Sequence, residues 1–205
     1  MNRVATGSKH ITQEEIRTLR ELALRLGASD ARTVDSVEIR ISDHLADLCR
    51  EPKCDQYGTS GNGPPHVSGP DGLRAIRAVC PVALAVRIDL PIDILRSDDR
   101  RQVMVVLHEM VAGIERAATE MGYSRSSGFA GGCCKSLFCF DHPECRVLAG
   151  GRCRHPDSAR PSMSGFGVDV AHLMATVGWS DDLGAASGTA PAGGTSWVAG
   201  LVLIG

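Results

Sequence analysis

The sequence predicts a mixed α/β (α+β) fold, in which a sheet of about four strands packs with helices and two cysteine-rich loops emerge from the core. Segments with helical spacing of apolar residues alternate along the chain with apolar, β-branched segments. The 205 residues, of which 43% are hydrophobic and 22% charged, are enough to bury one core. Because no repeat or boundary interrupts this pattern, we expect residues 1–205 to form a single domain.

Four helices are predicted from the spacing of apolar residues. The first begins after Thr12, which opens a capping box, and ends at Gly27. The longest begins at the Ser97-Asp98-Asp99 cap and runs to about Met121. Shorter helices are expected over residues 71–79 and 164–177.

Three segments have the pattern of strands. Residues 33–41 alternate between apolar and polar, whereas residues 82–90 and 197–204 are continuously apolar, as expected for buried strands. A further short segment lies near residues 127–130. The Ala/Gly/Ser-rich residues 184–194 have the composition of a flexible connection.

Charge and hydropathy exclude several classes of protein. The net charge of −2 and the pI near 6.4 provide no overall positive field for phosphates or an anionic membrane, so we expect neither a nucleic-acid nor a membrane partner. The first fifteen residues lack the apolar core of a signal peptide, which predicts a cytoplasmic protein. In that reducing compartment, eight cysteines indicate metal binding or redox chemistry rather than disulfides.

The second cysteine loop, residues 131–156, carries five of the eight thiols. It has little apolar content of its own, and four thiolates around iron or zinc would provide the cross-link that it needs. We select four of the five as metal ligands and treat Cys133 as spare, because adjacent thiols seldom ligate one centre. The selected ligands are Cys134, Cys139, Cys145 and Cys153.

The spacing of these cysteines matches neither a zinc ribbon with its paired C-x2-C knuckles nor the C-x2-C-x2-C run of bacterial ferredoxins. Pro156, close behind Cys153, is typical of iron-sulfur loops, and Gly131-Gly132 would allow the backbone to approach sulfur closely. We therefore favour an iron-sulfur cluster, [4Fe-4S] first, with zinc as the alternative.

The first cysteine loop, residues 49–66, contributes Cys49 and Cys54. Two thiols alone cannot close a tetrahedral site, so the pair either adds ligands to the same centre or belongs to a second one. Cys80, next to a predicted strand, is interpreted as a buried structural thiol.

Together the two loops resemble a bacterial and archaeal family of predicted metal-binding proteins, a domain of unknown function. The resemblance spans roughly residues 49–170, and it implies metal binding, with an iron-sulfur cluster favoured, but no established reaction. The motifs that carry it are Cys49, Cys54, Tyr57-Gly58 and Gly63-Pro64-Pro65, then Gly132, Cys134, Cys139, Cys145, Cys153-Arg154-His155-Pro156, Ala159-Arg160-Pro161-Ser162-Met163 and Gly167-Val168-Asp169-Val170.

Two departures from the family pattern affect the interpretation. Gly63 stands where the family has a cysteine, and the second loop is longer between its cysteines. One hypothesis is that the first site is lost and the second loop alone binds a cluster. The other is that the missing thiolate leaves an iron open to substrate as a Lewis acid.

Charged residues around the loops have two interpretations each. Arg154 and Arg160 are candidate cofactor-binding residues, because guanidinium groups offset the charge of a thiolate-bound cluster or receive a substrate carboxylate. Surface salt bridging is the alternative for both.

His108 and Glu109 form no metalloprotease motif, since no second histidine follows four residues after His108. We expect both at partly solvated helix positions.

These observations favour an iron-sulfur protein that carries electrons to a redox partner protein. The first alternative is an enzyme whose [4Fe-4S] cluster has an open iron that acts on a small-molecule substrate. The second is a zinc-stabilised interaction module without catalytic chemistry.

Overall fold

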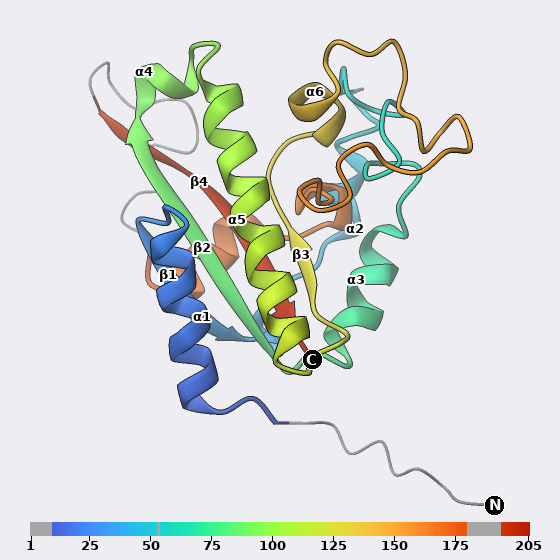
Figure 1. Ribbon diagram of the computed structural model, residues 1–205. Coiled ribbons are helices and arrows are strands. Elements are labelled where there is room, and N and C mark those ends of the chain that lie inside the picture. The colour runs from blue at the N-terminus through green and yellow to red at the C-terminus, as the bar shows by residue number, and fades with distance from the viewer. Residues whose placement is uncertain (1–9, 53, 180–193) are drawn as a thin grey trace, which may run out of the picture.

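The computed structural model describes residues 10–52, 54–179 and 194–205, and it is built around one antiparallel sheet (Figure 1). The strand order is β1-β2-β4-β3, so β4 lies between β2 and β3. This confirms the predicted fold class and the four-stranded sheet. The strands are β1 (Asp30–Asp35), β2 (Val82–Pro91), β3 (Ser127–Phe129) and β4 (Thr195–Ile204).

Two helices cover one face of the sheet. Helix α1 (Gln13–Arg25) has the predicted capping box between Thr12 and Glu15, and α5 (Arg100–Glu120) crosses the sheet beside it (Figure 1). Alternate residues of β2 and β4, such as Leu84 and Val202, pack beneath them in one apolar cluster. The period-2 alternation of the strands sends the intervening residues to the other face.

The second face is covered by α3 (Gly69–Arg77) and α7 (Val170–Thr176). Their buried residues, Leu73 and Leu173, pack with Ala85 and Leu201 of the sheet. Three short helices complete the described part of the chain. They are α2 (Asp43–Asp47), α4 (Ile92–Leu95) and α6 (Cys134–Phe138), and two 3-10 turns occupy Ser36–Glu38 and Ser164–Phe166.

Two sequence predictions differ from the structure in detail, and a third falls almost wholly outside the described residues. The predicted strand 33–41 begins earlier and ends at Asp35, where the 3-10 turn starts. The predicted helix 164–177 is interrupted because Gly167 adopts a left-handed φ of 73°, and Asp169 then caps a separate α7. Apart from Gly194, the predicted flexible segment 184–194 lies outside the described residues.

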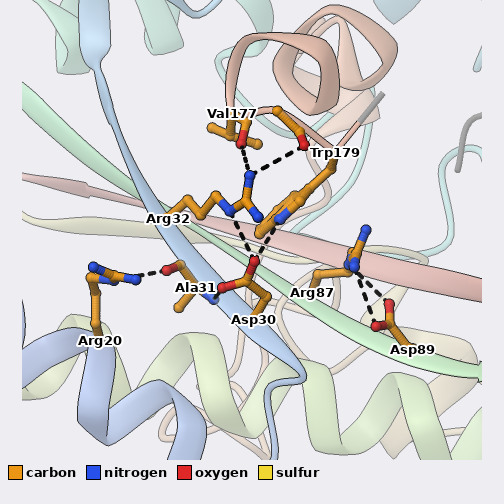
Figure 2. A network of polar contacts seen from close by, with 9 residues as sticks. Arg20, Asp30, Ala31, Arg32, Arg87, Asp89, Val177 and Trp179 are labelled. Atoms are coloured by element: carbon orange, nitrogen blue, oxygen red, sulfur yellow. Dashed lines mark hydrogen bonds and ion pairs between the residues drawn. The ribbon is translucent and has the colours of Figure 1, made fainter. Parts of the chain in front are cut away.

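A polar network fastens the end of α7 to the edge strand β1 (Figure 2). The indole N–H of Trp179 donates to Asp30 Oδ2 over 2.8 Å, and Arg32 Nε donates to the same oxygen over 2.9 Å. Arg32 also donates to the carbonyl oxygen of Val177. The guanidinium of Arg87 lies 5.1 Å from the Trp179 ring centroid and pairs with Asp89. The network therefore holds the segment after α7 against the β1 edge of the sheet.

Among the helices of the described ranges, none combines the length and the apolar character that crossing a membrane requires.

Candidate metal centre

His108 of α5 holds both ends of the second cysteine loop. Its side chain is fully buried, Nε2 lies 2.9 Å from the carbonyl oxygen of Gly131, and the backbone N–H of Arg160 donates to Nδ1 over 3.1 Å. Burial lowers the pKa of His108 to about 4. The prediction of a partly solvated position is therefore wrong for His108, because the loop covers this side of α5, and confirmed for the exposed Glu109.

Arg160 continues this attachment through its side chain. Its Nε donates to Glu115 Oε2 of α5 over 2.7 Å, and the same carboxylate oxygen accepts the backbone N–H of Gly128 over 2.8 Å. The guanidinium of Arg160 also donates to the carbonyl oxygens of Pro156 and Ala159. The structure thus gives Arg160 an ion pair at the loop base, and its assignment as a cofactor-binding residue stays a prediction.

The second loop begins with a close approach to α5 that requires glycine. A Cβ at Gly131 would lie 2.8 Å from the Met104 methyl group, and Gly132 adopts a left-handed φ of 74°. The glycines make room for Met104, and the predicted close approach of their backbone to a cluster sulfur stays a prediction. The turn leads into α6, of which Cys133 is the N-cap and Cys134 the first residue.

Among the four predicted ligands of the second loop, the charges of Cys145 and Cys153 affect the pKa values of Cys134 and Cys139. Burial raises the pKa of Cys134 to about 11, and the charges of Cys133, Cys153 and Cys145 add to this rise. Burial likewise raises the pKa of Cys139, again with contributions from Cys153 and Cys145. Cys134 and Cys139 lie at the two ends of α6 and are buried, whereas Cys145 and Cys153 are half-buried.

Hydrogen-bond donors point at these sulfur atoms. Burial alone would raise the pKa of Cys145. The backbone N–H groups of Gly61, Leu148 and Val147 outweigh this effect, so the pKa is lowered overall. The backbone N–H of His155 donates to Cys153 Sγ over 3.4 Å, and Ser60 Oγ lies 3.0 Å from Cys134 Sγ. Donors of this kind stabilise thiolates and the negative charge of thiolate-bound metal centres.

Two cationic side chains, those of Arg154 and Lys135, lie near the sulfur atoms. The charges of Arg154 and Lys135 each oppose the rise in the pKa of Cys139, which burial dominates. Lys135 Nζ donates to the carbonyl oxygens of Cys139 and His142, and Arg154 donates to that of Glu144. Arg154 therefore lies where the sequence analysis placed it, beside the thiols, although its cofactor contact stays a prediction.

The first cysteine loop packs directly against the second. Ser60 reaches Cys134, and Thr59 Oγ1 lies 3.7 Å from Cys133 Sγ. A Cβ at Gly61 would lie 2.6 Å from a methyl group of Val147, so the two loops are in close contact there. Residues of the first loop therefore form part of the surroundings of Cys133 and Cys134.

A cavity of about 490 Å³ lies beside this contact, and three thiols line it. Cys49 and Cys54 of the first loop reach it together with Cys133, the cysteine that the sequence analysis set aside as spare. Burial raises the pKa of Cys49, and the nearby charge of Cys54 raises it further. Other lining residues are Gln56, Tyr57, Asn62, Gly63, Pro64, Ser97, Asp98, Arg100, Arg101, Met104, Gly132, Ser136, Leu137, Ser162 and Ser164.

The eight cysteines are all free thiols. Within the described ranges, no three Cys, His, Asp or Glu side chains are arranged so that they could hold one metal ion together. Cys80 is confirmed as a buried structural thiol, since its Sγ lies 3.4 Å from the carbonyl oxygen of Arg125 and burial raises its pKa to about 11.

Comparison with known proteins agrees with this thiol-rich arrangement. No curated protein and no solved structure matches the chain. The family described as Predicted metal-binding protein (DUF2284) matches residues 32–204. This range includes both cysteine loops and all of the sheet except the first two residues of β1. The chain belongs to this family of predicted metal-binding proteins.

Proposed function

We propose that Cys134, Cys139, Cys145 and Cys153 hold an iron-sulfur cluster of the [4Fe-4S] type, and that the protein transfers electrons to a redox partner in the cytoplasm. The observation that carries the proposal is the common surroundings of these four sulfurs. Ser60 Oγ lies 3.0 Å from Cys134 Sγ, the His155 N–H donates to Cys153 Sγ, and the charges of Cys145 and Cys153 act on both Cys134 and Cys139. When bound, such a cluster supplies one-electron transfer.

Three kinds of group would stabilise the bound cluster. Backbone N–H groups and Ser60 point at the sulfurs, Arg154 and Lys135 offset their negative charge, and the His108 contacts fix the ends of the loop. Hydrogen bonds and nearby positive charge both raise the reduction potential of a cluster, because they favour the form with the extra electron. The chain therefore supplies tuning groups as well as ligands.

Iron-sulfur is favoured over zinc because the ligands come singly from different local structures. Cys134 begins α6, Cys139 is its C-cap, and Cys145 and Cys153 lie in irregular segments further along. The tetrathiolate zinc sites of small domains use paired knuckles instead.

An exposed apolar edge supports the electron-transfer function. Cys145 lines a second cavity of about 460 Å³ together with Phe140 and Leu148. The side chains of Phe140, Val147 and Leu148 are exposed although they are large and apolar. A redox partner that covers this edge would come close to the least buried thiols of the set.

Anaerobic purification followed by metal and sulfide analysis tests the proposal. We expect a brown protein, and replacing Cys139 and Cys153 together with serine should remove about four iron and four sulfide per chain. Cys80→Ala is the matched control, because it removes a buried thiol outside both loops and should leave the metal content unchanged. A colourless protein that carries stoichiometric zinc would refute the iron-sulfur assignment and support the zinc-stabilised module.

A further inference from the structure

The cavity of about 490 Å³ brings together four segments that lie far apart in the sequence. Tyr57 comes from the first cysteine loop, Arg100 from the first turn of α5, Ser136 from α6 and Ser164 from the second 3-10 turn. The volume lies within the usual range for small-molecule sites. Among the described residues that line the cavity, none is one of the four ligands predicted in the second loop. The cavity is therefore a feature separate from the proposed cluster.

One part of the cavity wall is apolar and continuous with the core. Met104 of α5 is 5% exposed and Leu137 of α6 is 7% exposed, and both belong to the apolar cluster beneath α5. Pro64 adds its ring from the first loop. An apolar group that lies against this wall would be removed from water, which favours binding. The wall therefore selects a ligand with an apolar body.

Another part of the wall carries two opposite charges, those of Asp98 and Arg100 at the start of α5. Both side chains are exposed, and within the described ranges neither the carboxylate nor the guanidinium has an ion pair or a side-chain hydrogen bond. The neighbouring Arg101 differs, because its Nε donates to the carbonyl oxygen of Leu137 over 3.1 Å. Its guanidinium also lies 3.5 Å from the Phe140 ring centroid. Asp98 and Arg100 are thus the charged groups that remain to meet a ligand.

A ligand that carries both a carboxylate and an ammonium group complements these two side chains. The guanidinium of Arg100 can donate to the carboxylate, and the carboxylate of Asp98 can accept from the ammonium group. A plain carboxylic acid would be repelled by Asp98, and a plain amine would be repelled by Arg100. An α-amino acid holds both groups on one carbon atom, which suits two charges that lie two residues apart in the chain.

We propose that the cavity binds an α-amino acid with a large apolar side chain. Its carboxylate meets Arg100, its ammonium group meets Asp98, and its side chain lies against Met104 and Leu137. The proposal goes beyond electron transfer by the second-loop cluster, because it gives the chain a small-molecule site that contains none of the proposed cluster ligands.

Isothermal titration calorimetry with three related compounds tests the class of ligand. The compounds are L-phenylalanine, 3-phenylpropanoate, which lacks the ammonium group, and 2-phenylethylamine, which lacks the carboxylate. We expect saturable binding of L-phenylalanine and an affinity about fivefold weaker for each of the other two. L-alanine, which keeps both charges but has little apolar surface, should also bind more weakly than L-phenylalanine.

Two variants assign the charges of the ligand to the wall. Asp98→Asn should weaken L-phenylalanine about fivefold and leave 3-phenylpropanoate no weaker than before. Arg100→Gln should weaken both of these compounds about fivefold and leave 2-phenylethylamine no weaker than before. Arg116→Gln removes an exposed arginine further along α5 and serves as the control, with all affinities unchanged.

Three results would overturn the proposal. They are the absence of saturable L-phenylalanine binding, equal affinities for the three phenyl compounds, and a loss in Arg116→Gln as large as that in Arg100→Gln. The heat of binding does not depend on the metal content, which is measured separately on the same preparation. A colourless protein that binds L-phenylalanine as described would refute the iron-sulfur proposal and support this one, whereas a brown protein that does not bind it would refute this one alone.

Discussion

The backbone N–H of Arg160 donates to Nδ1 of His108 across 3.1 Å, which fixes the tautomer of a fully buried imidazole. Because Nδ1 accepts this bond, the ring proton resides on Nε2, where it donates to the carbonyl oxygen of Gly131. The neutral side chain of His108 thereby connects Gly131, where the second cysteine loop begins, to Arg160, just beyond the end of the loop. Protonation of Nδ1 would break the Arg160 bond and place a charge in the core.

Stability should depend on pH through His108. Its pKa in the folded protein is lowered to about 4 by burial, from 6.5 in an exposed histidine, so the unfolded chain binds the proton more readily between these values. Stability is complete above about pH 6.5 and is lost as the pH falls toward 4. Between pH 7.5 and pH 5 we expect the apoprotein to lose about 2 kcal/mol from this group, measured by urea unfolding.

His108→Gln, which cannot take up a proton, should be less stable at pH 7.5 but should lack this part of the pH dependence. His66→Gln, at an exposed position, serves as the control and should keep it. Identical pH profiles for the natural protein and His108→Gln would show that the imidazole is not responsible.

Removing the carboxylate of Glu115 should weaken the base of the second loop. Glu115→Ala takes away the acceptor of both Arg160 Nε and the Gly128 N–H, and leaves a largely buried guanidinium without its ion pair. We expect a loss of about 2 kcal/mol in the free energy of unfolding. Glu109→Ala changes an exposed carboxylate on the same helix and should cost far less. Equal losses in the two variants would contradict the role of the ion pair.

The two tryptophans allow the polar contacts of Trp179 to be compared with a buried indole that lacks them. Trp179→Phe removes the indole N–H that donates to Asp30. Trp197→Phe removes a buried indole N–H for which the described residues provide no acceptor. Trp179→Phe also changes the ring on which the Arg32 and Arg87 guanidinium groups lie, so it should cost at least about 1 kcal/mol more in chemical denaturation. A larger loss in Trp197→Phe would invert the expected order.

Arg154 should raise the reduction potential of the proposed second-loop cluster. Its positive charge lies close enough to lower the pKa of Cys145 and to oppose the rise in that of Cys139. Arg154→Gln should therefore make reduction less favourable, by a shift on the order of 20 mV toward negative potential in voltammetry. Arg152→Gln, two residues earlier at an exposed position, should shift it less. A positive shift in Arg154→Gln would exclude this electrostatic role.

Much of the fold could be predicted from local patterns. The capping box at Thr12 and the apolar run of residues 82–90 specify their elements within a few neighbouring residues, and the structure has both where expected. The capping of α7 by Asp169 Oδ1 is equally local. By contrast, α6 was missed because its five residues lie in a segment whose cysteines dominate the pattern.

The candidate site could be predicted only in part, because its two thiol groups depend on contacts between distant segments. The four predicted ligands of the second loop were chosen from their density in sequence, and their role as ligands stays a prediction. The place of Cys133 does not follow from such a pattern, since nothing local indicates that Thr59 lies beside it or that it lines a cavity with Cys49. The burial of His108 was missed for the same reason, because the residues that cover it come from the loop and not from its own helix.

Strand β4 joins the sheet between β2 and β3, although it follows both in the chain. During synthesis, β3 and the second cysteine loop therefore leave the ribosome before the strand that fastens them to β2 has been made. The thiols emerge on a nascent chain without its finished scaffold, so insertion of the proposed cluster into a fixed site has to wait until residues 195–204 are in place.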